Sequence, residues 1–273
     1  MEDTIPEGPE VRKITEGLAA AISGQTLIST DIISGRYTKK EPSDWEVLKN
    51  KLPLKVVGAG VHGKFCYWLC SDEIFIYSTL GMTGSWNDHE KSHPRITFSF
   101  SSGKKVYFND QRNFGTIKVV VGKQNLINKL RSLGPDLLAQ DVPDQVFIEK
   151  IRKKPKWGIT KALMDQSVVA GVGNYIKSES LWLAKIDPHR KVASITDGEL
   201  AMLNRSIKSV MRESYQHNGS TVSAYQSFSI DESLVGQQQY LVYSKQVDPN
   251  GLTVVKDQTD DKRATYWVPE VQK

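Results

Sequence analysis

Cysteine is almost absent from this chain of 273 residues, which contains only Cys66 and Cys70. Two thiols within one short apolar run are too few and too close for a disulfide framework or a cysteine-based zinc site. No apolar run approaches the ~18 residues that a membrane helix needs. The acidic start MEDTIPEGPE also lacks the basic and then apolar pattern of a signal peptide. We therefore expect an intracellular protein, nuclear or cytoplasmic, that does not associate with a membrane.

Histidine is also sparse, and the 5 histidines show no metal-ligand spacing with carboxylates or thiols. We therefore expect no metal site and no cofactor. Internal repeats and low-complexity segments are absent as well. The hydrophobic share of 39% and the charged share of 25% are close to globular averages, which excludes intrinsic disorder and collagen-like structure. The length allows one large or two modest domains with a buried core.

Positive charge is in slight excess, because 36 Lys and Arg residues against 31 Asp and Glu residues give a net charge of +5. The run KIRKKPKWGITK, residues 150–161, contains no acid and precedes a helical pattern. Such a run is either a solvated charged face or a surface that faces phosphates. The run alone leaves both interpretations open.

Helical and strand patterns divide the chain. Apolar residues at spacings of three and four after Pro9 predict a helix over residues 9–22. Short β-branched and aromatic runs over residues 27–121 predict antiparallel strands in two packed sheets. Helical patterns follow to about residue 216, and strand-like text around a DPNG turn in residues 238–273 predicts a hairpin. The expected fold class is therefore α+β with more than one domain.

Four turns or loops stand out, each with an ordinary structural explanation. GVGN at residues 171–174 joins two predicted helices, either as a packing corner or as a phosphate site at the second helix's start. LGMTG and DQRNFG carry Met82, Arg112 and Phe114, which either fill the core or form the wedge that replaces an extruded nucleotide. Lys64 follows the tight loop HG, where a solvated lysine is the ordinary interpretation.

The ordered set of motifs along the chain resembles the formamidopyrimidine-DNA glycosylase and endonuclease VIII family, in its zincless-finger branch. Each motif alone is weakly specific, but their order over nearly the whole chain is highly specific. The motifs are PEGPEV, VHGKF, LGMTG, DQRNFG, LGPDLL, LMDQSVVAGVGNYIKSESL, IDPHR, NGSTV and RATYWVPEVQ. The resemblance implies an N-terminal helix plus two-sheet β-sandwich as catalytic domain (1–133), a linker (134–150), a helix-two-turn-helix DNA-binding domain (151–237) and a zincless finger hairpin (238–273).

The resemblance also implies roles for individual residues. Pro6 matches the amine nucleophile, and Glu7 matches the adjacent acid. Lys64 matches the lysine that contacts DNA and assists elimination. Arg263 matches the hairpin arginine that grips phosphates beside the lesion and takes part in the second elimination. Further DNA contacts are expected from His93, Arg112, Lys156 and Asn174, and the void opposite the flipped lesion is expected to be filled by Met82, Arg112 and Phe114.

Two departures from the family pattern bear on this expectation. The family's hairpin commonly binds zinc through four cysteines, whereas the corresponding positions here are Asn250, Thr253, Val268 and Val271. None of these residues supplies a thiolate. The hairpin must therefore hold its shape through strand pairing and packing, without the folding free energy of a metal.

The second departure concerns Pro6, whose nitrogen is an amide because five residues precede it. An amide nitrogen has no usable lone pair for imine formation. Three explanations compete: translation starts at Ile5 from a non-standard codon, a protease removes five residues, or the protein has lost lyase activity. The first is favoured, because Glu7, Lys64 and Arg263 are all present.

We therefore expect a monomeric, bifunctional DNA glycosylase and AP lyase of base excision repair. It flips an oxidised base out of duplex or single-stranded DNA, forms a Schiff base through Pro6 and cleaves the strand by β,δ-elimination. One alternative is a non-catalytic lesion-binding protein, because Pro6 is blocked. Another is a glycosylase that uses an activated water and Glu7 without cutting the strand. The sequence leaves open whether purines, pyrimidines or hydantoins are preferred, and residues 219–236 are expected to hold the loop that caps the flipped base.

Overall fold

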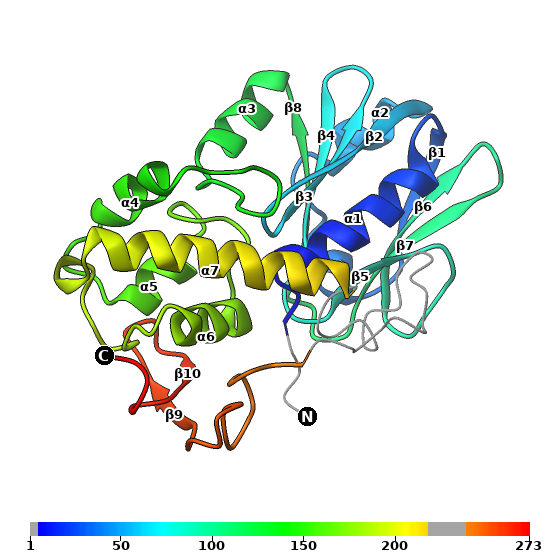
Figure 1. Ribbon diagram of the computed structural model, residues 1–273. Coiled ribbons are helices and arrows are strands. Elements are labelled where there is room, and N and C mark those ends of the chain that lie inside the picture. Colours follow the sequence, from blue (N-terminus) through cyan, green and yellow to red (C-terminus); the bar gives the residue numbers. More distant parts are fainter. Residues whose placement is uncertain (1–4, 218–238) are drawn as a thin grey trace.

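The computed structural model describes residues 5–217 and 239–273, and it begins with helix α1 (Gly8–Ile22) between a sheet and a group of helices (Figure 1). Pro9 stands in the first turn of α1, where its missing N–H would have no helical partner. The backbone N–H of Glu7 donates to the Glu10 carboxylate at 2.9 Å and completes this helix start. One face of α1 is buried in the sheet core through Val11, Ile14, Leu18 and Ile22.

Eight antiparallel strands form one sheet in the order β5-β7-β6-β1-β2-β3-β4-β8. Its two halves are joined by a short pairing of β1 with β2, at Thr26 with Lys55 and Leu27 with Leu54. The strands are β1 (Thr26–Ile32), β2 (Leu54–His62), β3 (Phe65–Cys70), β4 (Ile74–Thr79), β5 (Gly84–Asn87), β6 (Pro94–Phe100), β7 (Lys105–Asp110) and β8 (Thr116–Val121). A 3-10 turn η1 (Gly35–Thr38) and helix α2 (Trp45–Asn50) connect β1 to β2.

The two halves of the sheet pack against each other through aromatic side chains. The Trp68 ring on β3 lies 4.8 Å from the Phe98 ring on β6 and 5.1 Å from the Trp86 ring on β5, measured between centroids. The predicted sandwich is therefore confirmed, with its two layers formed by one bent sheet. Burial of these large rings in a single cluster supplies a substantial hydrophobic contribution.

Among the described residues, four of the five further helices pack around a second apolar core, whereas the helix at Lys123–Arg131 packs against the sheet through Leu126. Thr196 begins α7 with a capping box, because its hydroxyl accepts the Glu199 N–H at 3.2 Å and the Glu199 carboxylate accepts the Thr196 N–H. Among the described residues, no helix is both long and apolar enough to cross a membrane. The helices are α3 (Lys123–Arg131), α4 (Asp144–Arg152), α5 (Ile159–Met164), α6 (Asn174–Leu183) and α7 (Asp197–Gln216), with a 3-10 turn η2 (Val192–Ser194).

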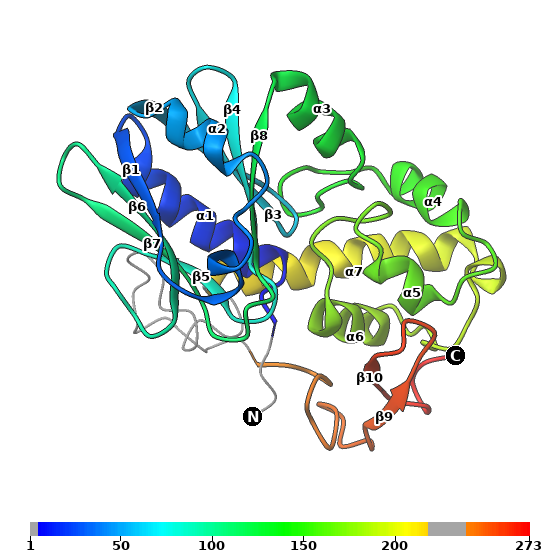
Figure 2. The same cartoon turned by 180° about the vertical axis from the view of Figure 1, so that it is seen from behind.

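Helix α7 reaches from the helical part to α1 and so connects the two halves of the molecule (Figure 2). The Lys13 ammonium lies 4.1 Å from the centre of the Tyr215 ring. The hydroxyl of Tyr215 donates to Glu16 at 2.7 Å. A third connection is the ion pair of Arg12 with Asp136, at 3.0 Å. These contacts hold α1 against the helical part of the molecule.

The C-terminal hairpin consists of β9 (Val255–Gln258) and β10 (Ala264–Trp267), joined by the turn at residues 259–263. The predicted reversal of the chain at the DPNG turn is present, but this turn does not join β9 to β10. That turn instead closes a separate loop with one isolated bridge, between Val247 and Thr253. Asp248 of the DPNG turn stabilises this loop, because its carboxylate accepts the N–H groups of Asn250 and Leu252.

Candidate functional site

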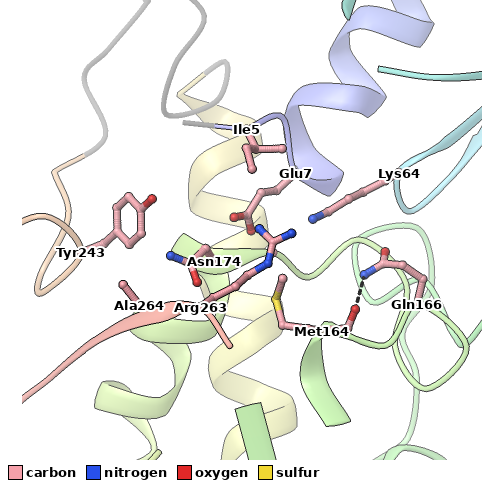
Figure 3. A pocket seen from close by; sticks show the side chains of 10 residues that line it. Ile5, Glu7, Lys64, Met164, Gln166, Asn174, Tyr243, Arg263 and Ala264 are labelled. Carbon is pink, nitrogen blue, oxygen red and sulfur yellow. Dashed lines mark hydrogen bonds between the residues drawn. The ribbon is translucent and has the colours of Figure 1, made fainter. Parts of the chain in front are cut away.

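A cavity of about 430 Å³ lies where the sheet part, the helical part and the hairpin meet (Figure 3). Glu7, Lys64 and Arg263 point toward one another in it from the start of α1, the loop after β2 and the hairpin turn. Four of the predicted site residues are therefore brought together, because Asn174 at the start of α6 also lines the cavity. The lining is Ile5, Glu7, Lys64, Met164, Gln166, Gly173, Asn174, Tyr243, Arg263 and Ala264.

Glu7 is buried with only 2% of its surface exposed. Its carboxylate accepts the Tyr175 N–H at 2.9 Å and the Ile176 N–H at 3.3 Å, which are free donors in the first turn of α6. Burial raises the pKa of Glu7 to about 7, although the positive charge of Lys64 acts in the opposite direction. A carboxyl group with this pKa can hold and release a proton near neutral pH, which suits a general acid.

Lys64 is half-buried on the loop between β2 and β3. Burial lowers the pKa of its ammonium group, and the Glu7 carboxylate partly restores it. The two side chains converge above Gly173. A methyl group added there would lie 2.5 Å from the Lys64 Nζ atom and 2.2 Å from the Glu7 Cδ atom. The missing side chain at Gly173 therefore makes room for the acid and the amine.

Pro6 is buried immediately before Glu7. Ile5 precedes it and lines the cavity, whereas Pro6 is not one of the lining residues, and in this chain its nitrogen is an amide. The structure thus places Pro6 beside the predicted acid. The role of Pro6 as the amine nucleophile stays a prediction.

Asn174 and Arg263 supply polar groups from the other side of the cavity. Asn174 is the first residue of α6, and its Oδ1 atom is buried without a hydrogen-bond partner. Arg263 is exposed and is the last residue of the hairpin turn, directly before β10. A guanidinium group and the N-terminal end of a helix both favour an anion, so this side of the cavity suits a phosphate group.

Met82, Arg112 and Phe114 do not line the cavity, but the structure places their two turns side by side. The Arg112 N–H donates to the Thr83 hydroxyl at 2.9 Å, next to Met82. The Arg112 guanidinium lies 5.3 Å from the Phe114 ring, and Phe114 is 55% exposed. An exposed aromatic ring beneath a cation, next to a methionine, is a surface suited to stacking against bases.

His93 and Lys156, two predicted phosphate contacts, lie on the surface away from the cavity lining. Both are exposed, and His93 has a left-handed backbone with φ of 64°. Lys156 belongs to the basic run, in which the ammonium groups of Lys154 and Lys161 lie 4.4 and 4.7 Å from the Trp157 ring centre. The geometry leaves the roles of both residues as predictions.

Several lining residues were not predicted from the sequence. Met164 and Gln166 belong to the LMDQ text before GVGN, and the amide of Gln166 donates to the Met164 carbonyl at 3.2 Å. Gly173 lies within the GVGN turn. A glycine there can indicate that other groups approach the backbone closely, and this was the signal available in the sequence. Ala264 directly follows Arg263 in the RATYWVPEVQ motif, whereas Tyr243 carries no comparable signal because it reaches the cavity only through the path of the C-terminal chain.

No group of three or more potential metal ligands occurs among residues 5–217 and 239–273. None of the four hairpin positions that correspond to the family's cysteines holds a cysteine. Val268 is fully buried in the apolar core and Val271 packs against that core. The donor set of the hairpin therefore does not fit a zinc ion.

Comparisons with known proteins agree with this geometry. Three family models match successive parts of the chain: the formamidopyrimidine-DNA glycosylase N-terminal domain over residues 5–117, its H2TH domain over 133–226 and its C-terminal domain over 236–273. A formamidopyrimidine-DNA glycosylase of Oceanobacillus iheyensis is 30% identical over 98% of both chains. One of Lactiplantibacillus plantarum is 28% identical over 98% of this chain and 100% of the relative.

Solved structures show the same likeness. A Lactococcus lactis FPG mutant in complex with Fapy-dG containing DNA matches with a TM-score of 0.85 and 28% identity, over 98% of this chain and 100% of that one. The Lactococcus lactis enzyme bound non-covalently to AP-site DNA matches with a TM-score of 0.83 and 27% identity, over 98% and 99%. The fold and the cavity thus define a two-domain protein of the DNA glycosylase class. The chain belongs to the formamidopyrimidine-DNA glycosylase family.

Proposed function

We propose that this protein is a bifunctional DNA glycosylase and AP lyase that removes oxidised bases during base excision repair. The observation that carries the proposal is the convergence of Glu7, Lys64 and Arg263 in one cavity between the two parts of the molecule. An acid, an amine and a phosphate-binding group are the chemical groups that base release and strand cleavage require. The relatives named formamidopyrimidine-DNA glycosylase support the glycosylase part of this proposal.

The proposed reaction begins when a free Pro6 amine attacks C1′ of the flipped nucleotide. An α-amino group has a pKa of ~7.7 to 8.0, so a useful fraction is uncharged at neutral pH. The amine displaces the base, which leaves with the electron pair of the C1′–base bond and with the proton that the Pro6 nitrogen loses. Protonated Glu7 then donates its proton to O4′ as the sugar ring opens and an iminium forms between C1′ and Pro6. Loss of a C2′ proton then expels the 3′ phosphate, and a second elimination assisted by Arg263 expels the 5′ phosphate. Lys64 holds DNA and assists the first elimination.

DNA binding is assigned to residues on both sides of the cavity. His93, Lys156, Asn174 and Arg263 are proposed to contact phosphates, and Met82, Arg112 and Phe114 are proposed to fill the gap in the stack. Flipping a nucleotide costs a few kcal/mol, which such void filling and phosphate contacts offset. We further propose that residues 1–133, 134–150, 151–237 and 238–273 form the four segments of a monomer. A DNA substrate places the activity inside the cell, in the nucleus or the cytoplasm.

A second candidate function is lesion binding without catalysis. The observation that favours it is the peptide bond between Ile5 and Pro6, which removes the amine from the cavity. A third candidate, base release by an activated water and Glu7, predicts abasic product that is cut only after alkali. The lesion class, purine against pyrimidine or hydantoin, is a question for competition assays. The predicted capping loop at residues 219–236 lies outside the described residues.

The test uses two preparations, one beginning at Met1 and one at Pro6. Each is mixed with duplex DNA that holds an oxidised base, reduced with borohydride and mapped by mass spectrometry. A cross-link at Pro6 in the shorter protein alone would establish the lyase mechanism and show that residues 1–5 block it. Tight lesion binding without a cross-link from either preparation would instead support the non-catalytic function.

A further inference from the structure

The hairpin turn, residues 259–263, is attached to the helical part through two consecutive carboxylates. Asp261 forms an ion pair of 2.7 Å with Lys177 of α6. The side chain of Lys177 is fully buried and that of Asp261 is 4% exposed. Asp260 accepts the Gly158 N–H at 2.6 Å and lies 3.6 Å from the Lys191 ammonium. The turn is thus fixed at two points, one on α6 and one before α5.

The Asp261 carboxylate also organises the turn internally. Its Oδ2 atom binds Lys177, while its Oδ1 atom accepts the Thr259 hydroxyl at 2.7 Å and the Arg263 N–H at 3.2 Å. One carboxylate therefore connects a buried lysine to the backbone of the residue whose guanidinium group enters the cavity. The Ser178 hydroxyl, next to Lys177, accepts the N–H of Tyr266 on β10 at 3.3 Å and extends the attachment.

Helix α6 connects the attachment of the hairpin turn to the cavity. Asn174 lines the cavity in the first turn of α6, and Lys177 lies about one helical turn later. The helix that presents Asn174 thus also holds the turn that presents Arg263. In a zinc-binding hairpin the metal supplies folding free energy, and here the four corresponding positions offer no ligand set for it.

We propose that the buried Lys177–Asp261 ion pair anchors the hairpin where relatives use a metal, and that Lys177 is a positioning residue for Arg263. The inference rests on the proposed function for the role of Arg263, but the anchoring itself does not depend on DNA. Removing one partner of a buried ion pair leaves an uncompensated charge, whereas exchanging both partners for a neutral pair does not. This difference allows the proposal to be tested.

The first measurement is hydrogen exchange of the free, full-length protein. Lys177→Met should lower the protection of the β9 and β10 amides at least tenfold while the amides of α7 keep theirs. Lys208→Met is the matched control, because it breaks a 2.8 Å ion pair with Asp141 in the same part of the molecule. The neutral pair Lys177→Gln with Asp261→Asn should recover hairpin protection. Unchanged protection in Lys177→Met, or an equal loss throughout the helical part, would overturn the proposal.

The second measurement is the salt dependence of binding to duplex DNA that holds a stable abasic-site analogue. Lys177→Met should reduce the slope of log K against log salt by about one unit, as loss of one phosphate contact does. In an Arg263→Ala background the same substitution should have no further effect on the slope. Additive effects would show that the ion pair stabilises the fold without positioning Arg263. Absence of DNA binding by the unmodified protein would refute the proposed function and leave the exchange result standing.

Discussion

Glu7 combines burial with two backbone donors, and its properties follow from both. The N–H groups of Tyr175 and Ile176 hold the carboxylate in place, while burial raises its pKa to about 7. In a protein that begins at Pro6, Glu7→Gln should slow base excision by about 100-fold or more, because a general acid contributes on that scale. Single-turnover excision from lesion-containing duplex DNA measures the effect.

Binding provides the control for that substitution. Glutamine has nearly the shape of glutamate, so affinity for DNA with an abasic analogue should remain within a few-fold of the unmodified protein. Undiminished excision would remove Glu7 from its assigned role. Loss of both excision and binding would indicate a structural role for the residue.

Gly173 is a second residue whose effect is local. A methyl group there would collide with the Glu7 carboxyl and the Lys64 amine, although its φ of −132° is one that alanine adopts readily. Gly173→Ala should therefore slow excision by about 100-fold through displaced catalytic groups, with a small change in stability. Gly198→Ala is the matched control, because the nearest atom to its added methyl group lies 4.0 Å away. Equal activity of the two variants would contradict this assignment.

The residues of the site were predictable where they lie in motifs. Glu7, Lys64, Asn174 and Arg263 were predicted together, and the structure brings all four to one cavity. Tyr243 was not predicted, because its sequence position says nothing about which cavity a returning chain will border. The predicted roles of His93 and Lys156 need DNA to be tested.

Arg263 belongs to an element, the hairpin, that extends beyond the helical core. If its guanidinium contacts one phosphate, Arg263→Ala should weaken DNA binding and reduce the salt slope by about one unit. Lys104→Ala is the matched control, because Lys104 is an exposed cation at the turn between β6 and β7. Titrations at several salt concentrations measure both slopes. An unchanged slope for Arg263→Ala would mean that this side chain does not face DNA.

At the scale of elements, the spacing of hydrophobic residues and the residue types in turns predicted most of the strands and long helices. The alternation in residues 27–121 gives the two β layers because one face of each strand meets a shared aromatic core. Turn residues alone could not identify the hairpin, since DPNG and the turn at residues 259–263 both favour reversal of the chain. The second turn closes the paired strands because a buried lysine on α6 holds it. That contact joins residues far apart in the sequence.

At the scale of the whole molecule, the environment of Glu7, which precedes α1, depends on helix α6 of the helical part. The folded pKa of Glu7 is about 7, against 4.5 for an exposed glutamate. The folded protein therefore keeps a proton that the unfolded chain releases between these values. This contribution to stability is fully present below pH 4.5 and is lost as the pH rises to about 7. Glu7→Gln should gain stability relative to the unmodified protein across this range.

Urea unfolding of both proteins at pH 5 and pH 8 measures this difference. A constant offset between them would reflect the changed hydrogen bonds alone. Only a difference that grows toward pH 8 reports the titration of Glu7. Parallel stability curves would show that the carboxyl has an ordinary pKa in the folded protein.

The hydrogen bonds from α6 to Glu7 make one carboxyl a reporter of the distance between the two parts of the molecule. The N–H groups that donate to this carboxylate belong to Tyr175 and Ile176 in the helical part, whereas Glu7 itself is the N-cap of α1. Any opening of the cavity admits water to the carboxyl and returns its pKa toward 4.5. The C=O stretching band of Glu7 in an infrared spectrum near pH 6 would then disappear whenever the two parts separate. Domain motion could be followed in solution without an added label.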